Sequence, residues 1–292
     1  MARFVIKRGG EDRMPYFHIV ARTYRQDILL TSEPLSPKVW SAFRRAFPDA
    51  LAAVVMPDHV HVITPARDAE SALRRLRAVL SGIRRTSEGS GIRWQPPERP
   101  AETPDARHLR RQIRYVSLNP CRSGFVHDPL EWVWSTHRDI AGATVDPWVT
   151  EPRLAAALGD RAEGFASKWH SYVSGDPSVH VSGTRFPRPA RPNRLALHPL
   201  GLIVAAAAAA HRAPLERVLR RGPARSAFLA LAHASGWHDL TLIGLSADAS
   251  RWTARRRGRF GAAPKAAWLC LGDPRLVSLH MTEMHAPRID AE

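Results

Sequence analysis

A proline-rich stretch over residues 176–199 carries neither helical nor strand periodicity, and it limits how the rest of this chain can fold. Proline lacks the backbone N–H and fixes φ, so a stretch of this kind is typical of a linker between folded units. The 292 residues are enough for roughly two domains of ~150 residues. The sequence therefore predicts one unit before the linker and a second unit after it.

Before the linker, strand-like and helix-like patterns alternate. The patterns predict strands over 17–22, 51–55 and 59–64, helices over 36–47, 68–85 and 104–118, and a proline-rich loop over 89–104. This order is typical of an α+β fold, in which helices cover one face of an antiparallel sheet and leave the other face for function. We expect this unit to occupy residues 1–150, followed by a helical extension over 151–175.

After the linker, the sequence is alanine-rich and basic. Short helices are expected over 200–211, 215–220, 224–235, 240–245 and 247–257. We interpret 200–257 as an all-helical C-terminal domain. Residues 258–292 show no clear pattern beyond an apolar run at 266–271 and stay unassigned.

The charge balance predicts a polyanionic partner. Lys and Arg number 43 against 27 Asp and Glu, giving a net charge of +16 and pointing first to nucleic acid. The two cysteines are far apart and lack the spacing of a zinc site or a disulfide framework. The longest apolar run, 202–210, is about half of the ~20 residues that a membrane span needs. We expect a cytoplasmic, nucleoid-associated protein with no membrane partner.

Two histidines occupy alternate positions at the start of a predicted strand. Side chains alternate along a strand, so His59 and His61 point to the same face, as in a two-imidazole metal platform. The alternative is a half-buried strand whose outward positions are polar.

A tyrosine and an asparagine are one helical turn apart before Pro120. Tyr115 and Asn119 share a helix face, which places a phenolic nucleophile beside an amide oxygen able to complete a metal site. The alternative is a tyrosine packed on the sheet and an asparagine that ends the helix.

Taken together, these motifs resemble one family. Met-Pro-Asp-His-Val-His-Val-Ile at 56–63, Tyr-Val-Ser-Leu-Asn-Pro-Cys-Arg-Ser-Gly-Phe-Val at 115–126 and Trp-Val-Trp-Ser-Thr-His-Arg at 132–138 resemble the single-tyrosine HUH transposases. The most similar branch is the REP-associated, IS200-like tyrosine transposases, and the resemblance covers about residues 14–145. It implies a ferredoxin-like (RRM-like) sheet, a Mg²⁺ or Mn²⁺ site, and cleavage of single-stranded DNA.

The resemblance also implies a role for each residue of the two motifs. His59 and His61 match the family's metal ligands, Tyr115 matches the nucleophile, and Asn119 matches the third ligand.

The C-terminal domain has a resemblance of its own. Residues 224–232, 240–245 and 247–257 resemble the helix-turn-helix of the DNA-binding domain of the replication initiator DnaA. The dipeptide Ile243-Gly244 would supply the turn, and the second helix would read duplex DNA. The alternative is an alanine-rich bundle with a solvated basic face.

The leading hypothesis is a DNA transposase or strand transferase that cleaves and rejoins single-stranded or hairpin DNA through a 5′-phosphotyrosine, with Mg²⁺ or Mn²⁺. A domesticated, sequence-specific DNA-binding regulator without catalysis is one alternative, and a metallo-phosphoesterase using an activated water is another. Duplex DNA is expected at the C-terminal domain, and a homodimer is left open. The arginines expected to contact DNA are Arg74, Arg75, Arg77, Arg84, Arg107, Arg110, Arg111, Arg114, Arg122, Arg251, Arg255 and Arg256.

Overall fold

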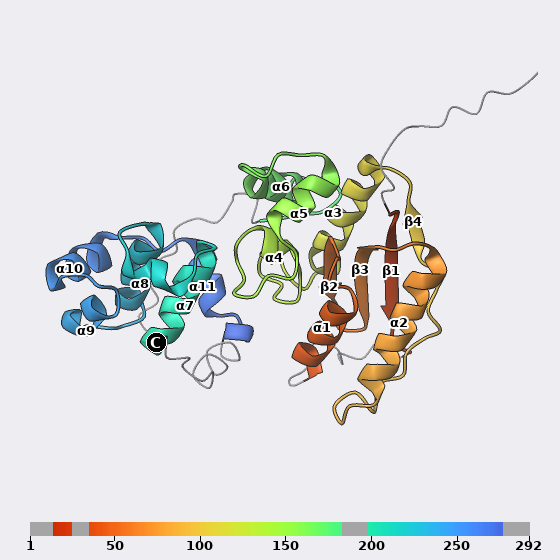
Figure 1. The fold of residues 1–292 in the computed structure, drawn as a ribbon, viewed down its shortest axis with the longest axis horizontal. Helices are drawn as coiled ribbons and strands as arrows, with labels where there is room; N and C mark the ends of the chain where they lie inside the picture. Colours follow the sequence, from red (N-terminus) through yellow and green to blue (C-terminus); the bar gives the residue numbers. More distant parts are fainter. Residues whose placement is uncertain (1–13, 25–34, 183–197, 277–292) are drawn as a thin grey trace, which may run out of the picture.

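The computed structural model describes residues 14–24, 35–182 and 198–276, which form two lobes joined side by side (Figure 1). The first lobe contains a four-stranded antiparallel sheet with the order β2-β3-β1-β4. The fold is therefore mixed α+β, as the sequence predicts. The strands are β1 (Tyr16–Arg22), β2 (Ala52–Val55), β3 (His59–Pro65) and β4 (Ala101–Thr103).

Strand β4 lies inside the segment 89–104, which was expected to be a loop. It is a three-residue edge strand paired with β1, and the Thr103 hydroxyl donates a hydrogen bond to the Tyr16 carbonyl at 3.0 Å. Short edge strands next to prolines carry little sequence signal. Thr103 ends this strand, and Asp105 caps the next helix by accepting a hydrogen bond from the His108 N–H.

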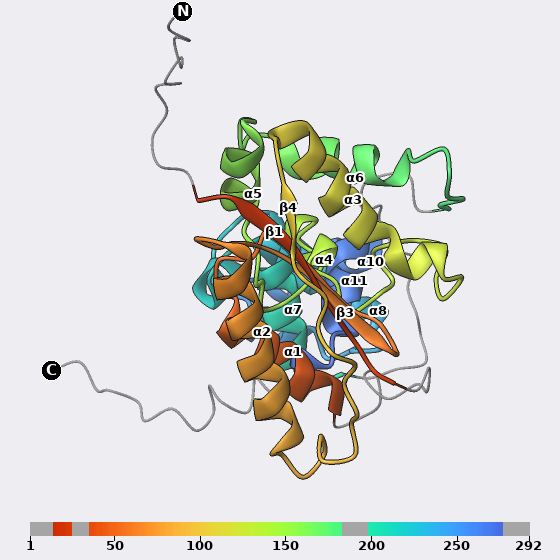
Figure 2. The same ribbon diagram turned by 90° about the vertical axis from the view of Figure 1, so that its right-hand side faces the viewer.

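Three helices surround the sheet. Helices α1 (Leu35–Ala46) and α2 (Ala69–Arg84) lie on one side of the strands in Figure 2, whereas α3 (Ala106–Arg122) lies on the other. The helices therefore do not all cover one face, and α3 reaches the face that was expected to stay open.

Helix α3 also runs past its expected end at residue 118. Pro120 lies in its last turn, where it removes only one backbone donor, and the Ser123 N–H still donates to the Asn119 carbonyl at 3.0 Å.

The helical extension packs onto α3. Helices α5 (Glu151–Leu158) and α6 (Phe165–Ser174) contact it, and the following residues stay with the same lobe. Val181 is buried in the core of the first lobe, and the Ser182 N–H donates to the His127 carbonyl at 2.7 Å. The first residues of the expected linker 176–199 are thus part of the first lobe, while 183–197 lie outside the described residues.

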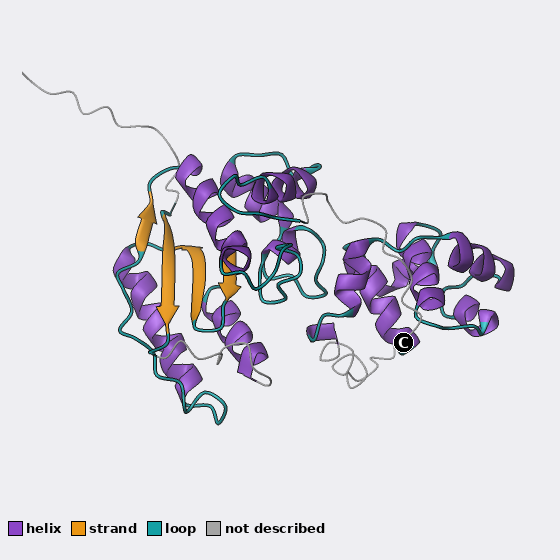
Figure 3. Ribbon diagram, turned by 180° about the vertical axis from the view of Figure 1, so that it is seen from behind, coloured by secondary structure: helices purple, strands orange, loops and turns teal. Residues whose placement is uncertain are grey.

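The second lobe is a cluster of helices (Figure 3). Helix α10 begins four residues later than expected because Asp248 takes a left-handed φ of 46° and Ser250 caps the helix. Helix α11 falls in the segment left unassigned, yet its Ala267 and Cys270 belong to the same core. This lobe therefore extends beyond residue 257, and 277–292 lie outside the described residues. Its elements are α7 (Leu200–Ala210), η1 (Leu215–Leu219), α8 (Pro223–Ala234), α9 (Leu240–Leu245), α10 (Arg251–Phe260) and α11 (Lys265–Leu271).

Polar contacts join the two lobes. The buried Arg138, from the short helix α4 (His137–Ile140), donates to the Leu269 carbonyl at 2.8 Å. Lys265 forms an ion pair of 2.6 Å with the buried Asp128. Buried polar groups need hydrogen-bond or ion-pair partners. These contacts therefore hold the two lobes in one relative position.

A second buried group at the same junction is an Asp–Arg pair. Asp273 accepts two hydrogen bonds from the guanidinium of Arg275, at 2.9 and 2.8 Å, and a third from Thr144 at 3.1 Å. The guanidinium lies 5.2 Å from the ring centre of Trp40 and 5.8 Å from that of Trp134. The end of the described second lobe is therefore anchored between two tryptophans of the first lobe.

None of the described helices is both long and apolar enough to cross a bilayer.

A buried histidine pair makes the stability of the first lobe depend on pH. His137 Nε2 lies 3.0 Å from His170 Nδ1, both residues are buried, and burial together with the neighbouring His170 lowers the pKa of His137 well below 6.5. The unfolded chain then binds a proton that the folded chain does not bind below pH 6.5. The free energy of unfolding should fall by about 1.4 kcal/mol for each pH unit below that value.

Urea unfolding at pH 7.5 and pH 5.5 measures this effect. In His137→Gln, the free energy of unfolding should differ less between the two pH values than it does in the unchanged protein. An equal difference in both proteins would show that His137 is not the group responsible.

Candidate active site

The β2–β3 hairpin places two imidazoles on one face of the sheet. His59 and His61 both lie on β3, and their ring centres are 4.8 Å apart. Asp58, in the turn of the hairpin, lies 2.6 Å from His59 Nδ1 and fixes the orientation of that ring. The Nε2 atom of His59 therefore points away from the turn, toward α3.

Helix α3 contributes an amide to the same place. Asn119 Oδ1 lies 3.3 Å from His59 Nε2, and Asn119 Nδ2 lies 3.1 Å from His61 Nε2. His61 and Asn119 are buried, so the amide and the two imidazoles form a compact polar group between sheet and helix.

Tyr115 lies one turn before Asn119 on the same helix. Its ring centre is 5.8 Å from that of His61, and 38% of the residue is exposed to solvent. The guanidinium of Arg122 lies 5.4 Å from the centre of the tyrosine ring. The structure thus brings together the four residues of the two sequence motifs and leaves the tyrosine accessible.

His18 is a fifth member of this group. A lone histidine on a strand carries no motif, so the sequence alone does not mark His18 as a site residue. Its Nε2 lies 2.9 Å from His61 Nδ1, and its ring centre lies 6.3 Å from that of Tyr115. Burial lowers the pKa of His18 to about 4. Burial and the charges of His18, His59 and Arg22 lower the pKa of His61 to about 2, so both imidazoles are neutral near pH 7.

A cleft of about 470 Å³ opens beside Tyr115. Asp176 lines one side of the cleft and forms ion pairs with Arg114 at 3.2 Å and with Arg122 at 3.3 Å. Sequence reasoning placed Asp176 in the linker, and no local pattern connects it with α3. The other residues that line the cleft are His18, His108, Arg111 and Gln112.

Comparison with known proteins follows from this geometry. The chain is 26% identical over 142 residues to a curated protein of Escherichia coli strain K12, an alignment that covers 48% of this chain and 83% of the relative. That relative is a REP-associated tyrosine transposase. The chain is its distant homologue, and about half of the chain has no counterpart in the alignment.

A solved structure of a REP-associated tyrosine transposase bound to a REP hairpin covers 48% of this chain and 86% of that one, with 24% identity and a TM-score of 0.36. No protein-family model matches the chain.

The arginines expected to contact DNA divide into several groups. Like Arg114 and Arg122, which pair with Asp176, two others bond to acceptors of the chain itself: Arg75 donates to the Ala46 carbonyl at 2.6 Å, and Arg110 forms an ion pair of 2.7 Å with Asp160. These two guanidinium groups stabilise the fold, because their donors are turned toward acceptors of the chain itself. Arg111, Arg114 and Arg122 line the cleft beside Tyr115, and Arg107 is exposed near the beginning of α3.

The remaining arginines lie away from Tyr115. Arg74 and Arg77 share Glu70 on the exposed side of α2, where Arg84 is also exposed, and α2 lies across the sheet from α3 (Figure 2). Helix α10 lies at the end of the second lobe that is remote from the sheet (Figure 1).

The three arginines of α10 that were expected to contact DNA do not share one face of the helix. Arg251 is exposed, but Arg255 and Arg256 line two different grooves on either side of α10, because adjacent residues of a helix point in different directions.

Among the described residues, no group of three or more His, Cys, Asp or Glu side chains is arranged to hold a metal ion. The group at the candidate site contains two histidines and an amide, and the Asp58 carboxylate contacts His59. A carboxylate that orients a histidine is a common neighbour of metal-bound imidazole. The donor set at His59, His61 and Asn119 is therefore compatible with a divalent cation.

Proposed function

We propose that this chain is a DNA transposase or strand transferase of the single-tyrosine HUH class, acting on single-stranded or hairpin DNA. The observation that carries the proposal is the meeting of His59, His61, Asn119 and Tyr115 between β3 and α3. Distant homology to a curated tyrosine transposase supports the same type of function.

The sheet supports the proposal at the level of the fold. The elements follow one another in the order β-α-β-β-α-β, with the strand order β2-β3-β1-β4, which is the arrangement of a ferredoxin-like sheet. We propose this fold for the first lobe.

A divalent cation, Mg²⁺ or Mn²⁺, would be held by His59 Nε2, His61 Nε2 and Asn119 Oδ1. When bound, the cation would act as a Lewis acid on a non-bridging oxygen of the scissile phosphate. Asp58 would keep the His59 ring in place, and His18 would do the same for His61.

Tyr115 would be the nucleophile. Its phenolic oxygen would form a bond to phosphorus, and the bond from phosphorus to the 3′-oxygen would break. The phenolic proton would leave to solvent, and the 3′-oxygen would take up a proton to give a free 3′-OH. The resulting 5′-phosphotyrosine is again a phosphodiester, so an incoming 3′-OH can rejoin the strand without a nucleotide cofactor.

The cleft beside Tyr115 suits a DNA backbone. Arg111, Arg114 and Arg122 line it, and an unpaired strand can enter it with its bases free to be recognised. Asp176 would hold Arg114 and Arg122 at the mouth of the cleft in a fixed position.

Duplex DNA is proposed as a partner of the second lobe, through a helix-turn-helix formed by α9 and α10. The turn is supplied by 246–250 rather than by Ile243-Gly244, which lie inside α9. Gly244 is still required there, because a Cβ at this position would meet the Ala249 carbonyl oxygen at 2.5 Å.

The proposal is tested by incubating the full chain with 5′- and 3′-labelled single-stranded and hairpin oligonucleotides in Mg²⁺ or Mn²⁺. We expect an adduct that survives denaturing electrophoresis and carries the label located 3′ of the cut. Binding of DNA without any adduct across a varied oligonucleotide pool would favour the regulator without catalysis.

Removing either imidazole should abolish cleavage. His59→Ala and His61→Ala each take away one of the three donors, and a two-donor site cannot fix the position of a cation. We expect at least a hundredfold lower adduct yield, and chelation of the unchanged protein should have the same effect. Full activity in excess chelator would rule out a metal at this site.

A further inference from the structure

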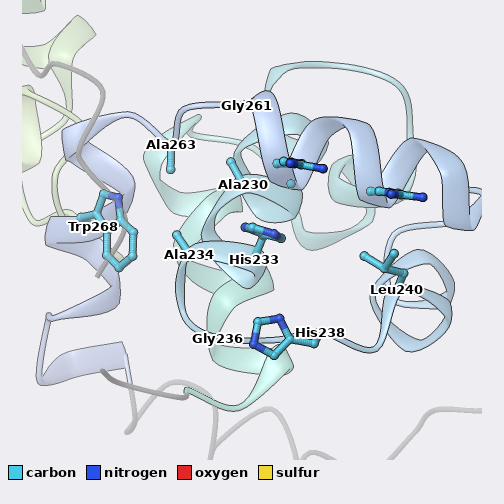
Figure 4. Close-up of a pocket in the computed structure, with 12 residues that line it drawn as sticks. Ala230, His233, Ala234, Gly236, His238, Leu240, Gly261, Ala263 and Trp268 are labelled. Carbon is cyan, nitrogen blue, oxygen red and sulfur yellow. The ribbon is translucent and has the colours of Figure 1, made fainter. Parts of the chain in front are cut away.

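The described residues of the second lobe form a cavity away from Tyr115. It has a volume of about 780 Å³ and lies among α8, α10 and α11 and the loops that join them (Figure 4). This volume falls in the range of small-molecule binding sites, roughly 300–1,000 Å³. The chemistry proposed for Tyr115 does not use it.

The cavity exists because small residues line it. Ala230 and Ala234 form the wall on α8, and Gly258 allows α10 to approach α8, since a Cβ there would meet the His233 Cβ at 2.9 Å. Helix α10 is therefore held close to α8, while the alanines beside the contact leave space.

The polar side chains of this cavity are basic. Arg255 and Arg259 enter from α10, and His233 and His238 enter from α8 and the loop after it. Among the described residues that line the cavity there is no carboxylate. A cavity whose described ionisable groups are all basic favours an anion.

One end of the cavity is aromatic. Trp268 of α11 lies across from Leu240 in Figure 4, with His233 between them. This end thus offers a flat apolar surface, which suits a planar ring.

We propose that this cavity binds a single unpaired nucleotide, with its base against Trp268 and the alanine wall and its phosphate against Arg255 and Arg259. That the nucleotide belongs to a DNA strand rests on the proposed function. A free mononucleotide has the same chemistry, so the experiment includes both sources. The second lobe would then distinguish a hairpin with an extrahelical nucleotide from a perfect duplex.

The test uses the full chain carrying Tyr115→Phe and two hairpins that differ only in one extrahelical 2-aminopurine. Binding is followed by anisotropy of an end label, and base stacking by quenching of the 2-aminopurine. We expect the hairpin with the extra base to bind about tenfold more tightly, since stacking of one base supplies that much. We also expect its 2-aminopurine to be quenched on binding.

Two variants test the lining, and one matched variant serves as control. Arg255→Glu should bind the two hairpins with about equal affinity. His238→Glu, which changes a loop residue and leaves the helices intact, should do the same. Arg251→Glu makes the same charge change on α10 outside the cavity, so it should weaken both hairpins and keep the preference. A preference retained in both lining variants would overturn the proposal.

The other outcomes are also decisive. Quenching of free 2-aminopurine riboside monophosphate at micromolar concentration, without any preference between hairpins, would assign the cavity to a free nucleotide. Absence of binding by both hairpins and by the free nucleotide would overturn the proposal. Adduct formation by the unchanged chain is measured separately and bears only on the function of Tyr115.

Discussion

Tyr115→Phe is expected to leave no detectable covalent DNA adduct, while the affinity for the same oligonucleotide stays within about twofold. The substitution removes only the phenolic oxygen, and the ring that faces His61 and Arg122 remains. Loss of a nucleophile typically lowers the rate by many orders of magnitude, since the residual groups cannot form the covalent intermediate. Denaturing electrophoresis with end-labelled DNA measures the adduct, and anisotropy measures the affinity.

Tyr24→Phe is the matched control. Tyr24 is 59% exposed, at the end of the described part of the first strand region, and has no asparagine one turn away. It should form the adduct at the level of the unchanged protein. An adduct that persists in Tyr115→Phe would move the nucleophile to another residue and remove the main support for the proposed chemistry.

Asp273→Ala is expected to lower the free energy of unfolding by about 3–5 kcal/mol, because it leaves buried guanidinium charge without its partner. Burial alone would raise the pKa of Asp273, but hydrogen bonds from Arg275 and the charges of Arg275 and Arg138 lower it below its usual range. The carboxylate is therefore charged at pH 7 and compensates both arginines. Urea unfolding followed by tryptophan fluorescence reports the change, since Trp40 and Trp134 lie beside Arg275.

A double variant separates the pair from the packing. Asp273→Leu with Arg275→Met removes both charges and should recover most of the lost stability, as for other buried ion pairs. Glu216→Ala, an exposed change in the same lobe, should shift the free energy of unfolding by less than about 0.5 kcal/mol. A loss below about 1 kcal/mol in Asp273→Ala would mean that the pair is not buried in solution.

The sequence predicted the parts of this molecule whose signals are local. The alternation around His59 and the one-turn spacing of Tyr115 and Asn119 each follow from the geometry of a single element. The helix over 240–245 also has its predicted limits, because Asp239 caps it directly, accepting hydrogen bonds from two backbone N–H groups at 3.0 Å.

What the sequence could not provide depends on contacts between distant segments. Asp176 reaches Arg114 across about 60 residues of chain, and His18 reaches His61 across the β1–β3 pairing. The same reason explains Arg75, which resembles a DNA-contacting residue along its helix until the Ala46 carbonyl takes up its donors. Helix spacing identifies the exposed side of one element but cannot show which other element will cover it.

The contacts of Arg138, Lys265 and Arg275 fix the distance between the two lobes. If the second lobe grips one part of a DNA hairpin and Tyr115 cuts another, the number of nucleotides between grip and cut is fixed by the junction between the lobes. The length of the chain that connects the lobes would then have little influence on where the strand is broken. Under the proposed function, cleavage at a constant distance from the recognised hairpin would give every excised DNA segment the same end.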